Sequence, residues 1–323
     1  MTTIEDLKLR GKYGGFLFLA DAARGIPWLK THQHVELEIN VVARGSVTYV
    51  VGRNRYTFQQ GECLWLFPSQ PHRCIDRTPD ALYYVVSFKP TLIARSCRQK
   101  ETAVLKKTRP PKNAVLHTQL PPAQFGLLRD IMDSLLELGL DSDTLNREVG
   151  YGLSPGFRYE HSRPDLLNSG LALILQLAWD SQMAPATERR ATRLHSSVVR
   201  ALDILKKESE SDCLKTLARE CGVSSAYLSR TFKQEVGVPI SRYRNTMRLE
   251  RFWEIRNKAT RHMTLSEAVY EAGFGSYSQF SKIYSATFGR CPKEIDKMFP
   301  PLNSAKTRPK KPISEHDLKN PQK

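Results

Sequence analysis

The sequence of 323 residues lacks an apolar run long enough to cross a lipid bilayer, and its six cysteines form no C-x-x-C pair. Its most apolar stretch, Leu171–Trp179, is far shorter than the roughly 20 residues that a membrane span needs. Scattered cysteines exclude a compact zinc cluster and a disulfide framework. The first ten residues include acidic side chains and no apolar signal segment. We therefore expect a cytoplasmic protein with no membrane partner.

Common catalytic arrangements are also missing. The sequence shows no serine–histidine–aspartate set, phosphate-binding glycine loop or acidic dyad in a supporting context. A group of histidines and glutamates between residues 32 and 72 is the remaining candidate for chemistry. We expect a protein that is not an enzyme and that carries no cofactor.

Positive charge, by contrast, is abundant and unevenly placed. Lys and Arg number 49 against 33 Asp and Glu, which gives a net charge of +16. Residues 189–299 hold 21 basic and 12 acidic residues, whereas residues 1–188 hold 22 and 19. A basic surplus concentrated in one region is typical of a surface that binds a polyanion. The expected partner is double-stranded DNA.

Residues 37–88 show the alternation of β-strands. Leu37, Ile39 and Val41 alternate with polar residues, and apolar runs follow at 47–51, 56–58, 63–67 and 81–88. Turn signals such as Gly52-Arg53-Asn54 separate them. Many short strands with regular turns predict a small barrel or sandwich, which we assign to residues 1–120.

Helical periodicity begins after Pro121-Pro122, and residues 121–183 predict two amphipathic helices. The second carries an apolar stripe formed by Leu167, Leu171, Ile174, Leu175 and Ala178. This stripe either pairs with a second chain, as in a homodimer, or packs on the barrel. Residues 184–193 lack apolar periodicity and predict a linker, residues 194–299 are helical, and the basic, proline-rich residues 300–323 predict a disordered tail.

An internal repeat lies within residues 214–292. The first repeated pairs, each 51 positions apart, are Leu214/Leu265, Leu217/Ala268, Ala218/Val269, Cys221/Ala272 and Gly222/Gly273. The next pairs, 52 positions apart, are Leu228/Phe280, Phe232/Tyr284 and Gly237/Gly289. The second copy therefore has one extra residue in its turn.

Each copy predicts a helix, a tight turn and a second helix. The glycine supplies the positive φ needed just past a helix end. Ser224 or Ser225 in the first copy, and Ser276 in the second, can cap the following helix. Thr264 and Glu267 have capping-box spacing. Two helices joined so closely cross steeply, which is the helix-turn-helix device that places its second helix in the major groove.

The connector between the copies, Ile240–Lys258, contains no helix breaker. As one helix it would span about 27 Å, close to the spacing of about 34 Å between successive major grooves on one face of DNA. One chain would then cover two adjacent half-sites without dimerising.

The motifs of the repeat resemble the DNA-binding domain of the AraC/XylS regulators. They are Gly222–Ser224 (GVS), Tyr227–Lys233 (YLSRTFK), Met247–Arg251 (MRLER), Ala272–Lys282 (AGFGSYSQFSK) and Pro292-Lys293. The chain departs from the family pattern at Phe252 and Ile295, which are packing positions.

This resemblance implies which side chains meet DNA. The first recognition helix would present Ala226, Ser229, Arg230 and Lys233, and the second Tyr277, Ser278, Ser281 and Lys282. Arg230 is expected to grip guanine in a bidentate manner. Phosphate contacts are expected from Lys233, Arg242, Arg290 and Lys293. For each basic residue the alternative is an ordinary solvated charge.

The histidine and glutamate group has a regular spacing. His32, His34, Glu36 and Glu38 would share one strand face. With Gly45, Gly61, Pro68 and His72, the pattern H-x-H-x-x-x-E…G…G…P…H resembles that of the cupins. Among metal-binding cupins this resemblance implies a ligand set of His32, His34, Glu38 and His72. Pro68 and His72 are one residue closer than in that pattern, and a glycine between them is missing.

The resemblance is closer to the effector-binding cupins of the AraC/XylS family, which usually bind no metal. It implies that His34, Glu38 and His72 bond hydroxyls or carboxylates of a small molecule, with Trp28 or Trp65 as an aromatic wall. Core packing is the alternative for Trp65, and an exposed strand end is the alternative for His32.

The resemblance thus implies a multidomain α+β protein, with a cupin-like barrel, a helical dimerisation segment and an all-α double helix-turn-helix domain. The expected function is transcription regulation in response to a small molecule, a sugar or sugar derivative, with an aromatic acid as the alternative. RNA polymerase is a further expected partner. The competing functions are a metal-dependent cupin enzyme tethered to DNA and a non-specific architectural protein.

Overall fold

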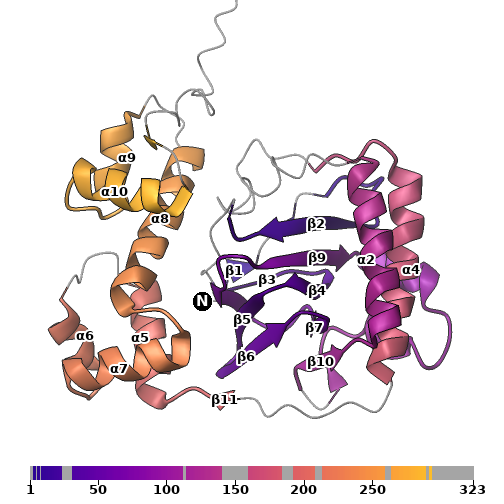
Figure 1. Cartoon of the computed structure of the whole chain (residues 1–323), viewed down its shortest axis with the longest axis horizontal. Helices are drawn as coiled ribbons and strands as arrows, with labels where there is room; N and C mark the ends of the chain where they lie inside the picture. The colour runs from indigo at the N-terminus through magenta and orange to yellow at the C-terminus, as the bar shows by residue number, and fades with distance from the viewer. Residues whose placement is uncertain are drawn as a thin grey trace, which may run out of the picture.

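The structure is a computed structural model that describes residues 3–4, 6–7, 9–23, 31–111, 114–139, 159–183, 192–207, 213–258, 263–288 and 291–292. Figure 1 shows a β-structure flanked by helices on one side and a separate group of helices on the other. The predicted mixed α+β class, with an N-terminal β domain and a C-terminal helical domain, is confirmed. None of the helices in these ranges has the length and apolarity to span a membrane.

The N-terminal domain consists of two facing sheets, whose strands pair antiparallel except for β1 with β3. One sheet has the order β10-β7-β4-β9-β2 and the other β1-β3-β8-β5-β6-β11. The strands are β1 (Thr3–Ile4), β2 (Gly15–Asp21), β3 (His32–Gln33), β4 (Leu37–Arg44), β5 (Ser46–Val51), β6 (Asn54–Gln59), β7 (Glu62–Leu66), β8 (His72–Arg77), β9 (Leu82–Phe88), β10 (Leu116–Gln119) and β11 (Thr192–Arg193).

Strand β4 shows how side-chain alternation divides the domain into an interior and an outer face. Ile39 lies opposite Trp65 of β7 and faces outward with it, whereas Glu38 lies opposite Leu66 and Ser87 and faces the space between the sheets. The charged residue of this strand is therefore inside the barrel. Both faces of β4 are buried from Leu37 to Val42, and Glu38 is one of the buried residues.

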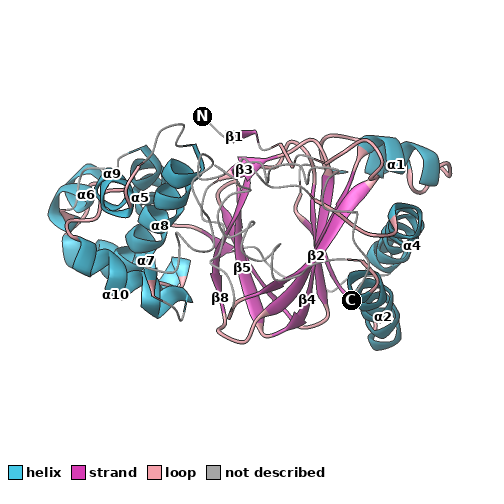
Figure 2. Cartoon of the chain, turned by 90° about the horizontal axis from the view of Figure 1, so that it is seen from above, coloured by secondary structure: helices cyan, strands magenta, loops and turns pink. Residues whose placement is uncertain are grey.

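Two long helices cover the outer face of the five-stranded sheet (Figure 2). They are α2 (Pro122–Glu137) and α4 (Pro164–Met183), and the shorter α1 (Pro90–Ser96) lies beside α4. The predicted stripe of α4 is completely buried in the same core as the barrel strands. Pairing of this stripe with a second chain is therefore wrong, because the barrel and α2 already cover it.

The C-terminal domain repeats a pair of short helices around a long one. Its helices are α5 (Ser196–Lys207), α6 (Leu214–Glu220), α7 (Ser225–Val236), α8 (Ile240–Lys258), α9 (Leu265–Glu271) and α10 (Tyr277–Phe288). We call α5–α7 the first lobe and α9–α10 the second lobe. The predicted connector, α8, is one continuous helix of 19 residues.

The predicted glycine turns and helix caps of the repeat are present. Gly222 and Gly273 follow α6 and α9 with φ of 71° and 90°. The Ser224 hydroxyl accepts the Tyr227 N–H at the start of α7, so Ser224 rather than Ser225 is the cap. Thr264 forms the full capping box at the start of α9. Glycine turns and side-chain caps, formed by residues close in the sequence, thus define both helix-turn-helix units.

The first lobe docks on the outer face of the β8-β5-β6 sheet, which the sequence did not predict. Val50 and Ile75 of the barrel belong to the same apolar core as Val198, Leu228 and Phe232 of this lobe. The Arg55 guanidinium donates to the Gln234 carbonyl at 3.0 Å. Strand β11, within the predicted linker, pairs with β6; residues 184–191 of that linker and the tail 300–323 lie outside the described residues.

Candidate functional site

Helix α7 buries one face and leaves the other in solvent. Leu228, Phe232 and Val236 recur every four residues and are completely buried. On the opposite side Ala226, Arg230 and Lys233 are exposed, while Ser229 is half-buried. This is the face that was predicted to read DNA. Docking on the barrel leaves this face exposed, and near the C-terminal end of α7 the Gln234 carbonyl accepts from Arg55 of the barrel.

Helix α10 is built in the same way. Phe280 and Tyr284 are completely buried in the core of the second lobe. Ser278 and Lys282 are exposed, Ser281 is half-buried, and the half-buried Tyr277 ring lies 6.0 Å from the Phe280 ring. Helices α7 and α10 therefore both present polar and basic side chains to solvent, as a groove-binding helix requires.

The predicted phosphate contacts divide into three cases. Lys233 is exposed on α7, beside Arg230. Arg242 is exposed near the start of α8, where its charge acts on Asp76 of the barrel. Burial raises the pKa of Asp76, and the guanidinium of Arg242 opposes this shift. Arg290 and Lys293 lie outside the residues that the structure describes.

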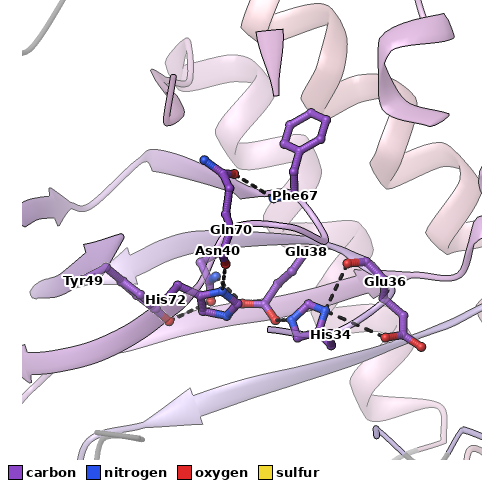
Figure 3. Close-up of polar contacts among 8 residues, drawn as sticks. All are labelled: His34, Glu36, Glu38, Asn40, Tyr49, Phe67, Gln70 and His72. Carbon is purple, nitrogen blue, oxygen red and sulfur yellow. Dashed lines mark hydrogen bonds and ion pairs between the residues drawn. The ribbon is translucent and has the colours of Figure 1, made fainter. Parts of the chain in front are cut away.

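A second candidate site lies between the two sheets (Figure 3), where the structure brings the predicted histidines and glutamate together. His34 Nε2 lies 3.0 Å from Glu38 Oε2, and its Nδ1 lies 3.0 Å from the Glu36 carbonyl oxygen. The His72 ring centre is 5.3 Å from that of His34 and 4.3 Å from that of His32. All of these side chains are buried, so His32 is not an exposed strand end.

The polar character of this interior extends to residues that the sequence did not predict. The Asn40 amide donates to Glu38 Oε1 at 2.7 Å, and the Tyr49 hydroxyl donates to Asn40 Oδ1 at 3.2 Å. Asn40 and Tyr49 belong to different sheets, so this chain of hydrogen bonds crosses the barrel. Ser87 lies opposite Glu38 on β9. Alternation along β4 could have indicated Asn40, but not its partner.

Neighbouring side chains lower the pKa of Glu38 against the effect of burial, whereas for His72 burial and a neighbouring side chain both lower the pKa. Burial would raise the pKa of Glu38, but the hydrogen bond and charge of His34, with a contribution from His72, lower it to about 2. Burial and the neighbouring His32 lower the pKa of His72 to about 3. At neutral pH the cluster therefore pairs a Glu38 carboxylate with a neutral His72 ring.

Trp65, one of the two predicted aromatic walls, does not join this cluster. Trp65 is buried on the outer face of its sheet, where its ring lies edge-on to Trp179 of α4 at 5.3 Å. Its register opposite Ile39 places it on the other side of β4 from Glu38. Core packing, the alternative reading of Trp65, is what the structure shows, and Trp28 lies outside the described residues.

Two family models match the chain. Residues 24–153 match an AraC-like ligand binding domain, and residues 217–298 match a helix-turn-helix domain. No curated protein sequence matches the chain.

Several solved structures are similar to the chain. Wild-type ToxT from Vibrio cholerae strain SCE256, bound to an unsaturated fatty acid, has 13% identity over 87% of this chain and 94% of that chain, with a TM-score of 0.32. The C-terminal domain of AraT, a response regulator from Geobacillus stearothermophilus, has 24% identity over 39% of this chain and 99% of that chain, with a TM-score of 0.30. A cupin 2 conserved barrel domain protein from Salinispora arenicola CNS-205 has 20% identity over 29% of this chain and 78% of that chain, with a TM-score of 0.22.

Proposed function

Because this chain belongs to the AraC/XylS family of transcription regulators, with a ligand-binding domain followed by a helix-turn-helix domain, we propose that it reads two adjacent DNA half-sites under control of a small molecule. The observation that carries the proposal is the exposure of both recognition faces at the two ends of α8. Nineteen helical residues extend over about 28 Å. That length suits two reading helices in successive major grooves, about 34 Å apart.

Selection from random duplexes by the full chain tests DNA reading. We expect a defined sequence to be enriched, and Arg230→Ala to weaken binding to it by about 1–3 kcal/mol while sparing random DNA. The reason is that a bidentate contact to guanine is lost at one base pair. Arg219→Ala is the matched control, because Arg219 is an exposed arginine of the same lobe on α6.

The outcome separates this proposal from non-specific DNA binding. A purely architectural protein would enrich no sequence, and Arg230→Ala would then weaken all duplexes equally at fixed salt. That result would contradict the assignment of α7 as a reading helix.

The effector is proposed to bind inside the barrel at His34, Glu38 and His72. Polar groups that converge in a buried interior suit a small molecule with several hydroxyls or a carboxylate, such as a sugar or sugar derivative. Strand β8 links this interior to the first lobe, because alternate side chains point to opposite faces. His72 faces the cluster, whereas Ile75 packs in the core of the lobe.

Binding at His72 would then shift the docking of the lobe, by as much as the effector prefers one arrangement over the other. Titration of a sugar panel, followed by the thermal unfolding midpoint and by DNA affinity, tests this step. A sugar that raises the midpoint in the wild type and not in Glu38→Gln supports the pocket. An aromatic acid that alone does so would replace the sugar assignment.

Dimerisation is proposed through the outer face of α2 and α4. Four of the six large apolar side chains exposed among the described residues lie there: Leu127, Leu138, Leu166 and Leu173. On each helix the pair is 11 or 7 residues apart, which places its members on one side. Sedimentation of the wild type and of Leu173→Lys at micromolar concentration tests the proposal, and a monomeric wild type would exclude it.

A contact with RNA polymerase stays a prediction.

A further inference from the structure

A cavity of about 500 Å³, open to solvent, lies where the barrel meets the first lobe. Arg53 lines it from the turn between β5 and β6, Arg193 from β11 and Arg200 from α5. Strand β11 connects the edge of the barrel with the first helix of the lobe (Figure 1). Among the described residues the cavity has none in common with the histidine cluster. It is therefore a second space of small-molecule size, which is roughly 300–1,000 Å³.

Positive charge dominates the lining of this cavity. The three arginines face one acidic residue, Asp203, which leaves a net charge of +2. All three arginines are exposed, and within the described part of the chain none of their guanidiniums has an ion pair or a hydrogen bond. By contrast, the exposed guanidinium of Arg10 lies 2.8 Å from a Glu160 carboxylate oxygen. The positive charges of the cavity are thus left for a ligand.

This arrangement of charge favours an anion. Like charges around one cavity repel one another, and a bound anion relieves the repulsion. A cleft lined by charges of one sign also raises the local concentration of ions of the opposite sign. Guanidinium groups bind phosphate and carboxylate through paired, parallel hydrogen bonds. The net charge of +2 matches a ligand with two negative charges.

Part of the lining is apolar and belongs to the junction of the two domains. Leu194 and Val199 both line the cavity. Leu194 is buried in the core that the first lobe shares with Val50 of the barrel, and its N–H donates to the Arg53 carbonyl at 3.2 Å. A ligand that fits this lining therefore has an apolar body beside its charged groups.

We propose that this cavity binds a small organic dianion, which carries a phosphate monoester or two carboxylates on an apolar body. Arg53 belongs to the barrel and Arg200 to the first lobe, so one dianion bound by both holds the two together. A ligand that binds the docked arrangement stabilises it. The site goes beyond the proposed function, because it is a second ligand site outside the barrel interior. Its occupation does not require that the protein reads DNA.

Calorimetric titration of the full chain at low ionic strength, with phenyl phosphate and with phthalate, tests the site. We expect one equivalent of at least one of these dianions to bind, and the tighter of the two assigns the phosphate or the dicarboxylate class. The neutral benzyl alcohol should not bind. Inorganic phosphate should bind more weakly than phenyl phosphate, because it has no apolar part to cover Val199. Binding should slow hydrogen exchange in β6 and α5 together.

Substitutions at exposed positions separate a ligand site from ordinary surface charge. Arg53→Gln and Arg200→Gln should each weaken binding of the dianion by about 10- to 100-fold, because hydrogen bonds to a charged group are lost. Asp203→Asn should tighten binding, since it removes the one carboxylate of the lining. Arg219→Gln is the matched control, because Arg219 is an exposed arginine on α6 of the same lobe, apart from the cavity. It should bind the dianion like the wild type.

The proposal is overturned if the wild type binds neither phenyl phosphate nor phthalate, or if Arg53→Gln and Arg200→Gln bind them as the wild type does. It is also overturned if the wild type binds no dianion and the two variants lose affinity for random duplexes, because the arginines would then be phosphate contacts to DNA.

DNA selection with the same preparations separates this proposal from the proposed function. Selective DNA binding without uptake of a dianion removes only the anion site. Uptake of a dianion without selective DNA binding removes the proposed function and leaves the anion site standing.

Discussion

The two helix-turn-helix lobes come from one repeated pattern, yet they differ in what surrounds them. The core of the first lobe includes Val50 and Ile75 of the barrel. The core of the second lobe is formed by residues of α8, α9 and α10 and their turns, and no barrel residue belongs to it within the described ranges. The barrel therefore shares an apolar core with the first lobe, and among the described residues it shares none with the second lobe.

Removal of the equivalent core aromatic from each lobe should show this difference most strongly. Phe232 and Phe280 are both completely buried, so Phe232→Ala and Phe280→Ala should each cost about 3–5 kcal/mol. Hydrogen exchange should show faster exchange in β5 and β8 for Phe232→Ala, because its core includes barrel residues. For Phe280→Ala, exchange in the barrel should stay at the wild-type rate. Equal effects on the barrel would contradict the comparison.

A substitution in the barrel should reach the first lobe. Ile75 is buried at 1% exposure in the core of that lobe, and Ile75→Ala should lower the free energy of unfolding by about 2–5 kcal/mol. Exchange should rise in α5 and α7 and not in α10. Val51→Ala is the control, since Val51 belongs to the barrel's own core and its loss should leave α7 protected. If Ile75→Ala left the exchange rate of α7 and the free energy of unfolding unchanged, the docking would not contribute to stability.

The turn after α7 allows a smaller and more local test. Gly237 has a φ of 89°, and a Cβ there would lie 2.5 Å from Asp76 Oδ2. Gly237→Ala should cost the strain of a left-handed residue, about 1–2 kcal/mol, and also displace the Asp76 side chain. Gly222→Ala has the same strain in open space and should cost less. In an Asp76→Ser background the two glycine substitutions should become equal in urea unfolding, and a persistent gap would show that Asp76 is not the cause.

Local features were predictable because their causes lie within a few residues. The positive φ of Gly222, the cap at Ser224 and the ends of α8 depend on neighbours in sequence, and the structure has each of them. The grouping of His34 with Glu38 follows from strand alternation in the same way. Their agreement across the repeat made the double helix-turn-helix domain readable from sequence alone.

Features that depend on register or on distant surfaces were not predictable. The residues next to Trp65 in the sequence are apolar at both alternating positions, so the sequence does not indicate which face of the sheet Trp65 lies on. Its pairing with Ile39 assigns it to the outer face. The segment His72–Arg77 is mostly polar, so its sequence does not show the apolar pattern of a strand. Its outward-facing Ile75 packs in the core of the first lobe, a partner that the sequence did not indicate. The stripe of α4 indicated burial but not the partner that buries it.

An exposed hydrogen bond, from Arg55 to the Gln234 carbonyl at 3.0 Å, also joins the barrel to the first lobe. Arg55→Ala should lower the free energy of unfolding by about 0.5–1.5 kcal/mol, because the contact is near solvent and the carbonyl at the end of α7 can bond water instead. Arg55→Lys keeps the charge and one donor, and should recover part of the loss. The Gln234 carbonyl has no counterpart contact in the second lobe within the described residues, so exchange at the end of α7 should rise while α10 stays unchanged. A loss shared equally by α7 and α10 would mean that the arginine acts through general charge rather than through this contact.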